Sequence, residues 1–379
     1  MSKNILHVVN ISFVLPYYIG DQFDNYKKLG LKAYVACTPS KHLVNYGLEK
    51  QFNILPVNIL REINILEDLK AISFLRAKII EEQIEIVIGH TPKGAMIAMI
   101  AARLAGVKRR VYFRHGLMYE TSTGLKRQML KCIEKLTGGL ATKVVCVSNS
   151  VVKKSISEGL NHPSKNMLLH FGTCNGIDIK KFSRENLNIQ TQTFLKEKYK
   201  IHPSDRVIGY VGRLVKDKGI SELILAWEIV RQKFFDVKLL LVGPFEERDC
   251  INKDIRHIID NDESIVCVGL ISDVLPYYGL MDVFILPSYR EGFPTVVLEA
   301  SSMGLPIITT KATGCIDSII ENETGIFCEI DPINIAAKIG FYLQNNELAV
   351  EHGLNGANFV VKNFKQEIIW KEIESKILS

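Results

Sequence analysis

The chain has 379 residues, of which 47% are hydrophobic and 23% charged, and its formal net charge is +6. This length can build two hydrophobic cores, so we expect two domains or one large one. The eight cysteines include no CxxC pair and no regular spacing, which argues against a zinc site and a disulfide scaffold and fits a reducing cytoplasm. No signal-peptide layout opens the sequence, and the apolar stretch 94–102 is too short to cross a bilayer. We therefore expect a cytoplasmic protein, soluble or at most peripheral on the inner face of the membrane.

The first half of the chain reads as an α/β domain. Short β-rich runs at 5–10, 32–37, 84–90, 109–115 and 143–148 alternate with helical patterns at 66–83, 94–106 and 124–138. Apolar strands that alternate with helices indicate a parallel sheet covered on both faces.

The second half repeats this pattern, with strands expected at 206–212, 237–243, 264–269, 283–288, 306–310 and 325–329. The polar stretch 186–204 reads as a linker and the start of a second module. We predict an α/β fold of two doubly wound, Rossmann-like domains facing each other across a cleft. They span 1–185 and 186–363, with a C-terminal helix at about 364–379 packing back on the first.

Charge differs between the two halves. Residues 1–185 carry 27 Lys and Arg against 14 Asp and Glu, a net of +13, whereas residues 186–379 carry 20 against 27, a net of −7. This asymmetry suggests two modules with different partners.

Ligands of doubly wound sheets bind beyond the carboxyl ends of the strands. His90 and His115 end strands of the first domain in this way, and Gly212, Gly243 and Ser288 end strands of the second. These strand ends are therefore where we look for a site.

The segment 287–306, PSYREGFPTVVLEASSMGLP, places two glutamates around a helix start. We expect Pro294 at the first helical position and Glu291 in the loop before it, with Glu299 inside the helix. The first-turn N–H groups, from Phe293 to Val296, would form an anion site, and a docked phosphate would bring its sugar beside Glu291. Glu299 could hold the hydroxyls of a ribose. Taken alone, this segment fits an alternative equally well, in which one glutamate caps the helix, the other is solvated, and neither binds a ligand.

The segment 209–220, GYVGRLVKDKGI, follows a strand and opens a helix. Gly212 would permit a tight turn, and Arg213 and Lys218 suit a diphosphate. Taken alone, the segment fits an ordinary turn with surface cations better. It contains neither a dinucleotide-binding nor a P-loop fingerprint.

Together these segments resemble glycosyltransferase family 4, whose members are retaining enzymes with the two-domain fold called GT-B. The family's two glutamates separated by seven residues match Glu291 and Glu299 in EGFPTVVLEA, and GRLVKDKG matches its diphosphate-binding loop. The segments 90–116 and 175–182 also match. The resemblance covers nearly the whole chain and is closest to the branch that builds bacterial capsules and lipopolysaccharide.

The resemblance implies a role for each matching residue. His115, Glu291, Arg213 and Lys218 would be catalytic: His115 near the reacting sugar, Glu291 on the hydroxyls of the donor sugar, and the two cations on the leaving diphosphate. The donor-binding residues would be Gly212, Arg213, Lys218, Glu291, Gly292, Phe293, Pro294, Thr295, Val296 and Glu299, with the base near 268–274. The first loop, 10–22, lacks the family's Gly-Gly pair and has only Gly20, so its contact with phosphates stays open.

We expect neither a metal nor another cofactor. Asp260 and Asp262 form a DxD pattern, but it precedes a strand in a polar segment and reads as a turn. His90 and His115 have no third ligand at a fitting spacing. A histidine at a strand end is more often structural, and the resemblance changes this for His115 alone.

The segment 124–136 reads as an amphipathic basic helix. Its apolar face would contain Leu125, Met129, Cys132, Ile133 and Leu136, and its basic residues are Lys126, Arg127, Lys131 and Lys135. Such a helix fits an anionic membrane, where a lipid-linked acceptor would lie. A core-packed helix with a solvated basic face is the alternative.

The sequence therefore predicts a retaining glycosyltransferase of bacterial surface polysaccharide synthesis. A UDP-sugar is the favoured donor, a glycan, in particular a lipid-linked one, is the acceptor, and no nucleic acid is involved. The alternatives are a nucleotide-sugar epimerase or glycosyl phosphorylase of the same fold, or a non-catalytic nucleotide-sugar-binding assembly partner.

Overall fold

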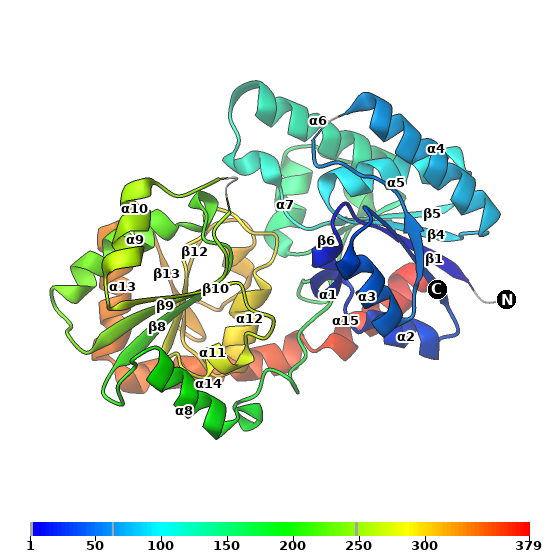
Figure 1. Cartoon of the computed structure of the whole chain (residues 1–379). Helices are drawn as coiled ribbons and strands as arrows, with labels where there is room; N and C mark the ends of the chain where they lie inside the picture. Colours follow the sequence, from blue (N-terminus) through cyan, green and yellow to red (C-terminus); the bar gives the residue numbers. More distant parts are fainter. Residues whose placement is uncertain (1–2, 63, 247–248) are drawn as a thin grey trace. The chain divides into compact units, whose positions relative to one another are not determined.

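The computed structural model describes residues 3–62, 64–246 and 249–379. The chain forms two compact units (Figure 1). Unit 1 comprises Met1–Gly176 and Gln366–Ser379, and unit 2 comprises Ile177–Lys365. These units are defined by contacts within the structure. The domains 1–185 and 186–363 are segments that we expect to fold independently, and this stays a prediction.

Unit 1 contains a seven-stranded parallel sheet in the order β3-β2-β1-β4-β5-β6-β7. Its strands are β1 (Asn4–Val8), β2 (Lys32–Cys37), β3 (Asn53–Pro56), β4 (Ile86–Gly89), β5 (Arg109–Arg114), β6 (Lys143–Cys146) and β7 (Asn166–Leu168). Its helices are α1 (Leu15–Tyr18), α2 (Gln22–Lys28), α3 (Lys41–Lys50), α4 (Ile65–Glu81), α5 (Pro92–Leu104), α6 (Gly124–Leu140), α7 (Asn149–Ser157) and α15 (Gln366–Ile373). The last helix is tied to the unit by Trp370, whose indole N–H donates to Asn175 Oδ1 at 2.9 Å.

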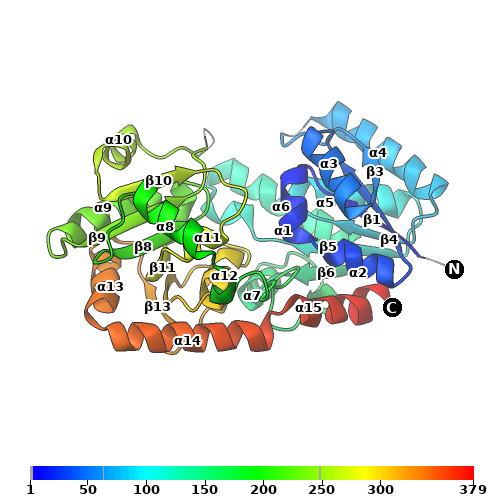
Figure 2. The ribbon, with the colours of Figure 1, turned by 60° about the horizontal axis from the view of Figure 1, so that its bottom comes forward.

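Unit 2 contains a six-stranded parallel sheet in the order β10-β9-β8-β11-β12-β13. Its strands are β8 (Arg206–Val211), β9 (Val237–Val242), β10 (Ile265–Gly269), β11 (Val283–Leu286), β12 (Ile307–Thr310) and β13 (Gly325–Cys328). Its helices are α8 (Ile189–Lys198), α9 (Ile220–Arg231), α10 (Lys253–Asn261), α11 (Leu275–Tyr278), α12 (Thr295–Ser302), α13 (Pro332–Gln344) and α14 (Asn346–Asn363). The long helix α14 packs against α12 (Figure 2).

Two parallel, doubly wound sheets confirm the predicted α/β fold class. The segments expected as strands all contain one, and the sequence analysis missed β3 and β7. These two are three- or four-residue strands at the edges of their sheet and are largely exposed or half-buried, so neither carries a long apolar run. No helix in the described part of the chain is both long and apolar enough to span a membrane.

Strand order reverses beside the first strand of each sheet. In unit 1, β1 lies between β2 and β4, and in unit 2, β8 lies between β9 and β11. The connections leave in opposite directions at these places, and doubly wound sheets bind their ligands at the carboxyl edge beside such a reversal. The fold therefore predicts one ligand-binding edge in each unit.

A buried ion pair links α6 to the sheet of unit 1. In the same unit, α5 packs between α4 and α6 (Figure 1). Arg114 Nε donates to Glu134 Oε2 at 2.9 Å, and the hydroxyl of Tyr112 donates to the same carboxylate. Arg114 also donates to Ser155 Oγ at 2.7 Å and to Asn161 Oδ1 at 2.9 Å. Arg114 is 0% exposed and Glu134 2% exposed, so each charge depends on the other.

We expect Glu134→Ala to destabilise the protein by about 3–5 kcal/mol, because it leaves the Arg114 guanidinium buried without its counter-charge. Thermal melting followed by circular dichroism measures this loss. The neighbouring Lys135 is exposed, so Lys135→Ala serves as the control and should stay within about 0.5 kcal/mol of the parent. Equal melting of the two variants would contradict a structural role for the pair.

Candidate functional site at the carboxyl edges of the two sheets

Two loops meet at the carboxyl edge of unit 2, one after β8 and one after β11. The first includes a short 3-10 turn, Lys216–Lys218, and then Gly219 with a φ of +71°. A Cβ atom on Gly219 would lie 2.1 Å from the carbonyl oxygen of Pro287 in the second loop. Glycine is therefore required there, both for its backbone conformation and for this close approach.

Ion pairs join these two loops at successive positions. Lys218 Nζ pairs with Glu291 Oε1, and the two side chains are 14% and 15% exposed. Asp217 Oδ2 lies 2.7 Å from Arg290 Nη2, and the Tyr289 N–H donates to the Asp217 carbonyl at 3.0 Å. The structure therefore brings Lys218 and Glu291 into direct contact, which the sequence did not predict.

The loop after β12 supports Glu291 from the other side. The Glu291 N–H donates to the Thr313 carbonyl at 2.9 Å. Gly314 has a φ of +82°, and a Cβ there would lie 2.5 Å from the Gly292 carbonyl oxygen. The backbone that carries Glu291 is thus held between two neighbouring loops.

Arg213 has an ion-pair partner of its own, and Glu291 and Asp217 also act on its charge. Its Nη1 pairs with Glu246 Oε2 at 2.8 Å, and the side chain is about half exposed. The Tyr210 hydroxyl donates to the Arg213 carbonyl at 2.9 Å and so fixes the turn that Gly212 begins. An anion that reached Arg213 would compete with Glu246 for it.

Helix α12 begins one residue later than the sequence predicts. Pro294 is the N-cap residue and has a ψ of 91°, which is not helical, so the expectation that it is the first helical residue is wrong. The loop after β11 turns into the helix only at Thr295. The first N–H groups of an α-helix have no partner within it, so the backbone of Thr295 and Val296 can still receive an anion. Gly292, Phe293 and Pro294 are buried beneath.

Glu299 is buried inside α12, as the sequence predicts for its place in the helix. It is 9% exposed, and its Oε2 accepts a hydrogen bond from the Tyr278 hydroxyl at 2.8 Å. Burial raises the pKa of this carboxyl to about 7, and the hydrogen bond from Tyr278 opposes the rise only in part. A buried carboxylate with one neutral donor can accept further hydrogen bonds.

Three histidines line the carboxyl edge of unit 1. His7 Nδ1 lies 3.0 Å from His90 Nε2, and His90 Nδ1 lies 2.9 Å from His115 Nε2. Tyr18 stacks on the His115 ring with centroids 3.6 Å apart. Burial lowers the pKa of His7 and of His115 to about 3, and that of His90 also lies well below its usual value.

The DxD pattern is engaged in local contacts. Asp260 Oδ2 lies 2.7 Å from Arg256 Nε within α10, and Asp262 Oδ1 accepts from the N–H and the hydroxyl of Ser264. Among the described residues, no group of three His, Cys, Asp or Glu side chains is arranged to hold a metal.

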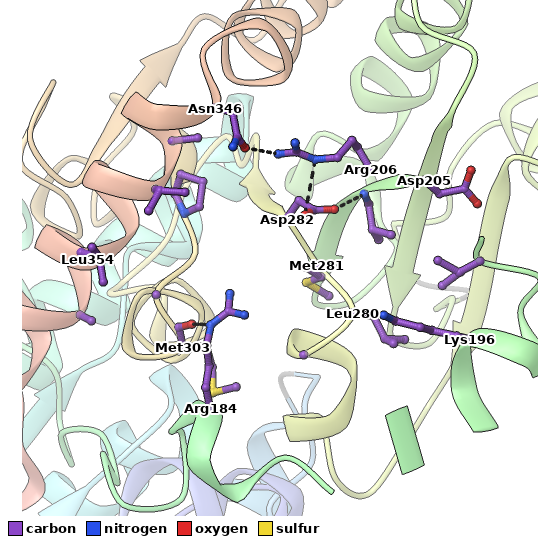
Figure 3. A pocket seen from close by; sticks show the side chains of 18 of the residues that line it. Arg184, Lys196, Asp205, Arg206, Leu280, Met281, Asp282, Met303, Asn346 and Leu354 are labelled. Carbon is purple, nitrogen blue, oxygen red and sulfur yellow. Dashed lines mark hydrogen bonds and ion pairs between the residues drawn. The ribbon is translucent and has the colours of Figure 1, made fainter. Parts of the chain in front are cut away.

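A cavity of about 650 Å³ lies at the opposite edge of unit 2 (Figure 3). Arg206, the first residue of β8, donates to Asn346 Oδ1 at 3.0 Å and pairs with Asp282, which precedes β11. Asp282 in turn accepts from the Val207 N–H at 2.7 Å. These polar groups join the amino ends of strands, so the cavity is separate from the Lys218–Glu291 edge.

Several supporting residues escaped the sequence analysis: Asp217 and Arg290, Glu246, Tyr278, Tyr18 and His7. One signal was available for the tyrosines, because the tetrapeptide LPYY occurs twice, as α1 and as α11. The last tyrosine of each copy contacts a site residue, His115 in unit 1 and Glu299 in unit 2.

The chain is similar to known glycosyltransferases in sequence and in fold. Residues 191–359 match the model of glycosyl transferases group 1, and residues 18–165 that of glycosyltransferase family 4. The capsular polysaccharide biosynthesis glycosyltransferase CapM of Staphylococcus aureus is 34% identical over 376 residues, which cover 99% of this chain and 96% of CapM. A UDP-Gal:alpha-D-GlcNAc-diphosphoundecaprenol alpha-1,3-galactosyltransferase of Escherichia coli is 27% identical over 79% of this chain and 76% of its own. The structure of Anabaena HepE in complex with UDP and glucose superposes with a TM-score of 0.82 at 17% identity, over 99% of both chains.

Glu299→Gln should raise the melting temperature at pH 8 and change it little at pH 5. The carboxyl has a pKa of about 7 in the folded chain and about 4.3 in an unfolded one, so stability falls as the pH rises through this window. The neutral amide avoids that loss, which amounts to up to about 4 kcal/mol. Scanning calorimetry at both pH values tests this, with the exposed Glu323→Gln as control. An equal effect at pH 5 and pH 8 would contradict the titration of Glu299.

Proposed function

Because the chain belongs to glycosyltransferase family 4, we propose that unit 2 binds a UDP-sugar and that the enzyme transfers its sugar to a lipid-linked glycan bound by unit 1. The observation that carries this proposal is the half-buried Lys218–Glu291 pair at the strand-order reversal of unit 2. A cation and a carboxylate in contact at a ligand-binding edge suit a donor that has both a diphosphate and a sugar.

The diphosphate would bind Lys218 and Arg213 together with the backbone N–H groups at the start of α12. Glu291 would then accept hydrogen bonds from hydroxyls of the donor sugar, and Glu299 from the ribose. Lys218 and Glu291 would exchange each other for the donor, and Arg213 would leave Glu246, whose side chain is partly exposed to water. Gly292, Phe293 and Pro294 are buried next to Glu291 in the sequence, and we assign them to the donor site because their motif resembles the family's.

Transfer would retain the anomeric configuration. The bond from the anomeric carbon to the phosphate oxygen breaks through an oxocarbenium-like state, and fixed cations stabilise the departing diphosphate. The acceptor hydroxyl would attack from the face that the diphosphate leaves, since no carboxylate is assigned as a nucleophile. We assign His115 to the same reaction as a catalytic residue because its motif resembles the family's.

The names of similar proteins support the substrate class. CapM is named for capsular polysaccharide biosynthesis, the Escherichia coli relative for an acceptor on diphosphoundecaprenol, and the HepE structure contains UDP and glucose. The name of the Escherichia coli relative contains both a UDP-sugar donor and a diphosphoundecaprenol-linked acceptor, and these are the two substrate classes that we propose.

We also propose that α6 contacts the anionic membrane that carries such an acceptor. Glu134 and Thr137 of this helix face the sheet, whereas Leu125 is 86% exposed, Leu136 49% and Met129 42%. The alternative, a core-packed apolar face, is wrong for these three residues. Lys126 and Lys135 flank the stripe, so an apolar and a cationic surface coincide, as in helices that lie in a membrane interface.

UDP should raise the melting temperature, and EDTA should leave this shift unchanged, because cations of the protein would neutralise the diphosphate. Loss of the shift in EDTA with recovery in manganese would overturn metal-free binding.

Glu299→Ala should bind UDP less tightly by about 2–5 kcal/mol, since it removes a buried charged partner. Titration calorimetry measures this difference. Glu291→Ala is the matched control: it should keep UDP affinity and lose sugar transfer. Unchanged UDP affinity in Glu299→Ala would overturn the ribose role of Glu299.

The protein should co-sediment with anionic liposomes at low salt and dissociate at high salt. Replacing Lys126, Arg127, Lys131 and Lys135 by glutamine should release it, at about 1 kcal/mol for each residue near the surface. Lys41 and Lys108 are exposed in unit 1 outside α6, and their replacement by glutamine is the control. Binding that survives the α6 changes, or that is absent at low salt, would exclude this surface.

A further inference from the structure

His7, His90 and His115, here called the histidine chain, come from three adjacent strands of unit 1. His7 lies in β1, and His90 and His115 follow β4 and β5 directly. Their rings are linked by two N···N contacts of 3.0 and 2.9 Å. The sequence pattern favours a structural role for His90 and predicts none for His7, and only the structure shows that the three rings form a continuous chain.

The contacts restrict where the protons can be. A neutral imidazole carries one N–H, and each N···N contact needs one proton. Burial and the mutual repulsion of charged rings keep the three rings neutral. Three protons are then available for two contacts, and the third must lie at one end of the chain: on His7 Nε2 or on His115 Nδ1.

The two ends differ in their surroundings. His7 is 1% exposed, and its Nε2 has no hydrogen-bond partner among the described residues. The ring lies between Tyr26, stacked at 5.7 Å, and the edge of Phe23 at 6.0 Å, and neither contact offers a hydrogen-bond acceptor. His115 is only half-buried and lies at the carboxyl edge, where ligands bind.

A buried N–H without an acceptor is rarer in proteins than an under-used acceptor atom. The third proton is therefore favoured at the outer end. In that arrangement His7 donates from Nδ1 to His90, His90 donates from Nδ1 to His115, and His115 keeps its own proton on Nδ1.

We propose that His7 and His90 are positioning residues that fix His115 as a hydrogen-bond donor through Nδ1 at the edge of unit 1. This rests on the proposed transferase function only for what His115 donates to: an oxygen of the substrate, such as a hydroxyl, a carbonyl or a phosphate oxygen. Tyr18, stacked on His115, fixes the plane of the ring.

The histidine chain also excludes His115 as a general base that passes a proton on through His90 to His7. A proton taken up at its outer nitrogen would have to leave at His7 Nε2, and no described group receives it there. His115 would thus orient and polarise a substrate oxygen, and the proton of the acceptor hydroxyl would leave by another route, with the departing diphosphate as the available base.

Nitrogen-15 spectra of the histidine rings in the full-length protein test the tautomers without any substrate. We expect a protonated Nδ1 and an unprotonated Nε2 in His7, His90 and His115, with no titration from pH 8 to pH 5. Four exposed histidines, His42, His162, His202 and His257, give reference signals in the same spectra. Protons on Nε2, or titration of the three rings between pH 8 and pH 5, would overturn the inference.

Variants of His90 connect the tautomer to the reaction. His90→Leu breaks both contacts, so kcat should fall at least about tenfold, because one donor to a developing charge is worth roughly 10²–10³ in kcat. His90→Gln can accept from His7 and donate to His115, so it should restore most of kcat and the Nδ1–H signal of His115. KM for the donor should change little in both.

Phe113→Leu is the packing control, because the Phe113 ring stacks on His90 at 5.1 Å and on His115 at 5.9 Å and cannot hydrogen-bond to either. It should keep the His115 signal and kcat. Equal losses in Phe113→Leu and His90→Leu would show that His90 acts only through packing, and failure of glutamine to restore the Nδ1–H signal would also overturn the proposal. Because the spectra need no substrate, the tautomer is decided even if the protein transfers no sugar from UDP-sugars.

Discussion

Parallel strands bring all their carboxyl ends to one edge of a sheet, and the arrangement of both sites depends on this constraint. In each unit the strand order reverses beside the first strand, which marks the ligand-binding part of that edge. Lys218 and Glu291 follow β8 and β11. In unit 1, His7 lies in β1, and His90 and His115 follow β4 and β5. The parallel sheet alone therefore brings together residues that are more than 70 positions apart in the sequence.

Burial then selects the partners of the polar groups at these edges. A charge removed from water needs an opposite charge or several hydrogen bonds, and a neutral polar atom needs at least one. The Lys218–Glu291 pair satisfies this by charge, Glu299 by the Tyr278 hydroxyl and an elevated pKa, and the histidines by staying neutral. In unit 2 these groups can exchange partners for a charged donor, whereas in unit 1 they hold a neutral ring in one orientation.

The sequence allows the strands, the main helices and the positions of Glu291 and Glu299 to be predicted, because these depend on local patterns of apolar residues, glycine and proline. The edge strands β3 and β7 could not be predicted, since they lack an apolar run of their own. The partners could not be predicted either. Asp217 with Arg290 and His7 with His90 are defined by neighbouring strands and loops, and a single sequence contains no signal for such contacts.

The two copies of LPYY show how a local pattern and a tertiary role can combine. In each unit a single helical turn with proline near its start places its last tyrosine against a site residue. Tyr278 supplies a hydroxyl to a carboxylate, and Tyr18 supplies a ring face to an imidazole. The same tetrapeptide thus serves different chemistry because the residue opposite it differs. The buried carboxyl of Glu299 can accept a hydrogen bond from a tyrosine hydroxyl. The neutral ring of His115 is already hydrogen-bonded to His90, so a stacked tyrosine only has to fix its plane. Under the proposed function, the charged groups of unit 2 would bind the diphosphate of the donor substrate, and unit 1 would orient a neutral hydrogen-bond donor.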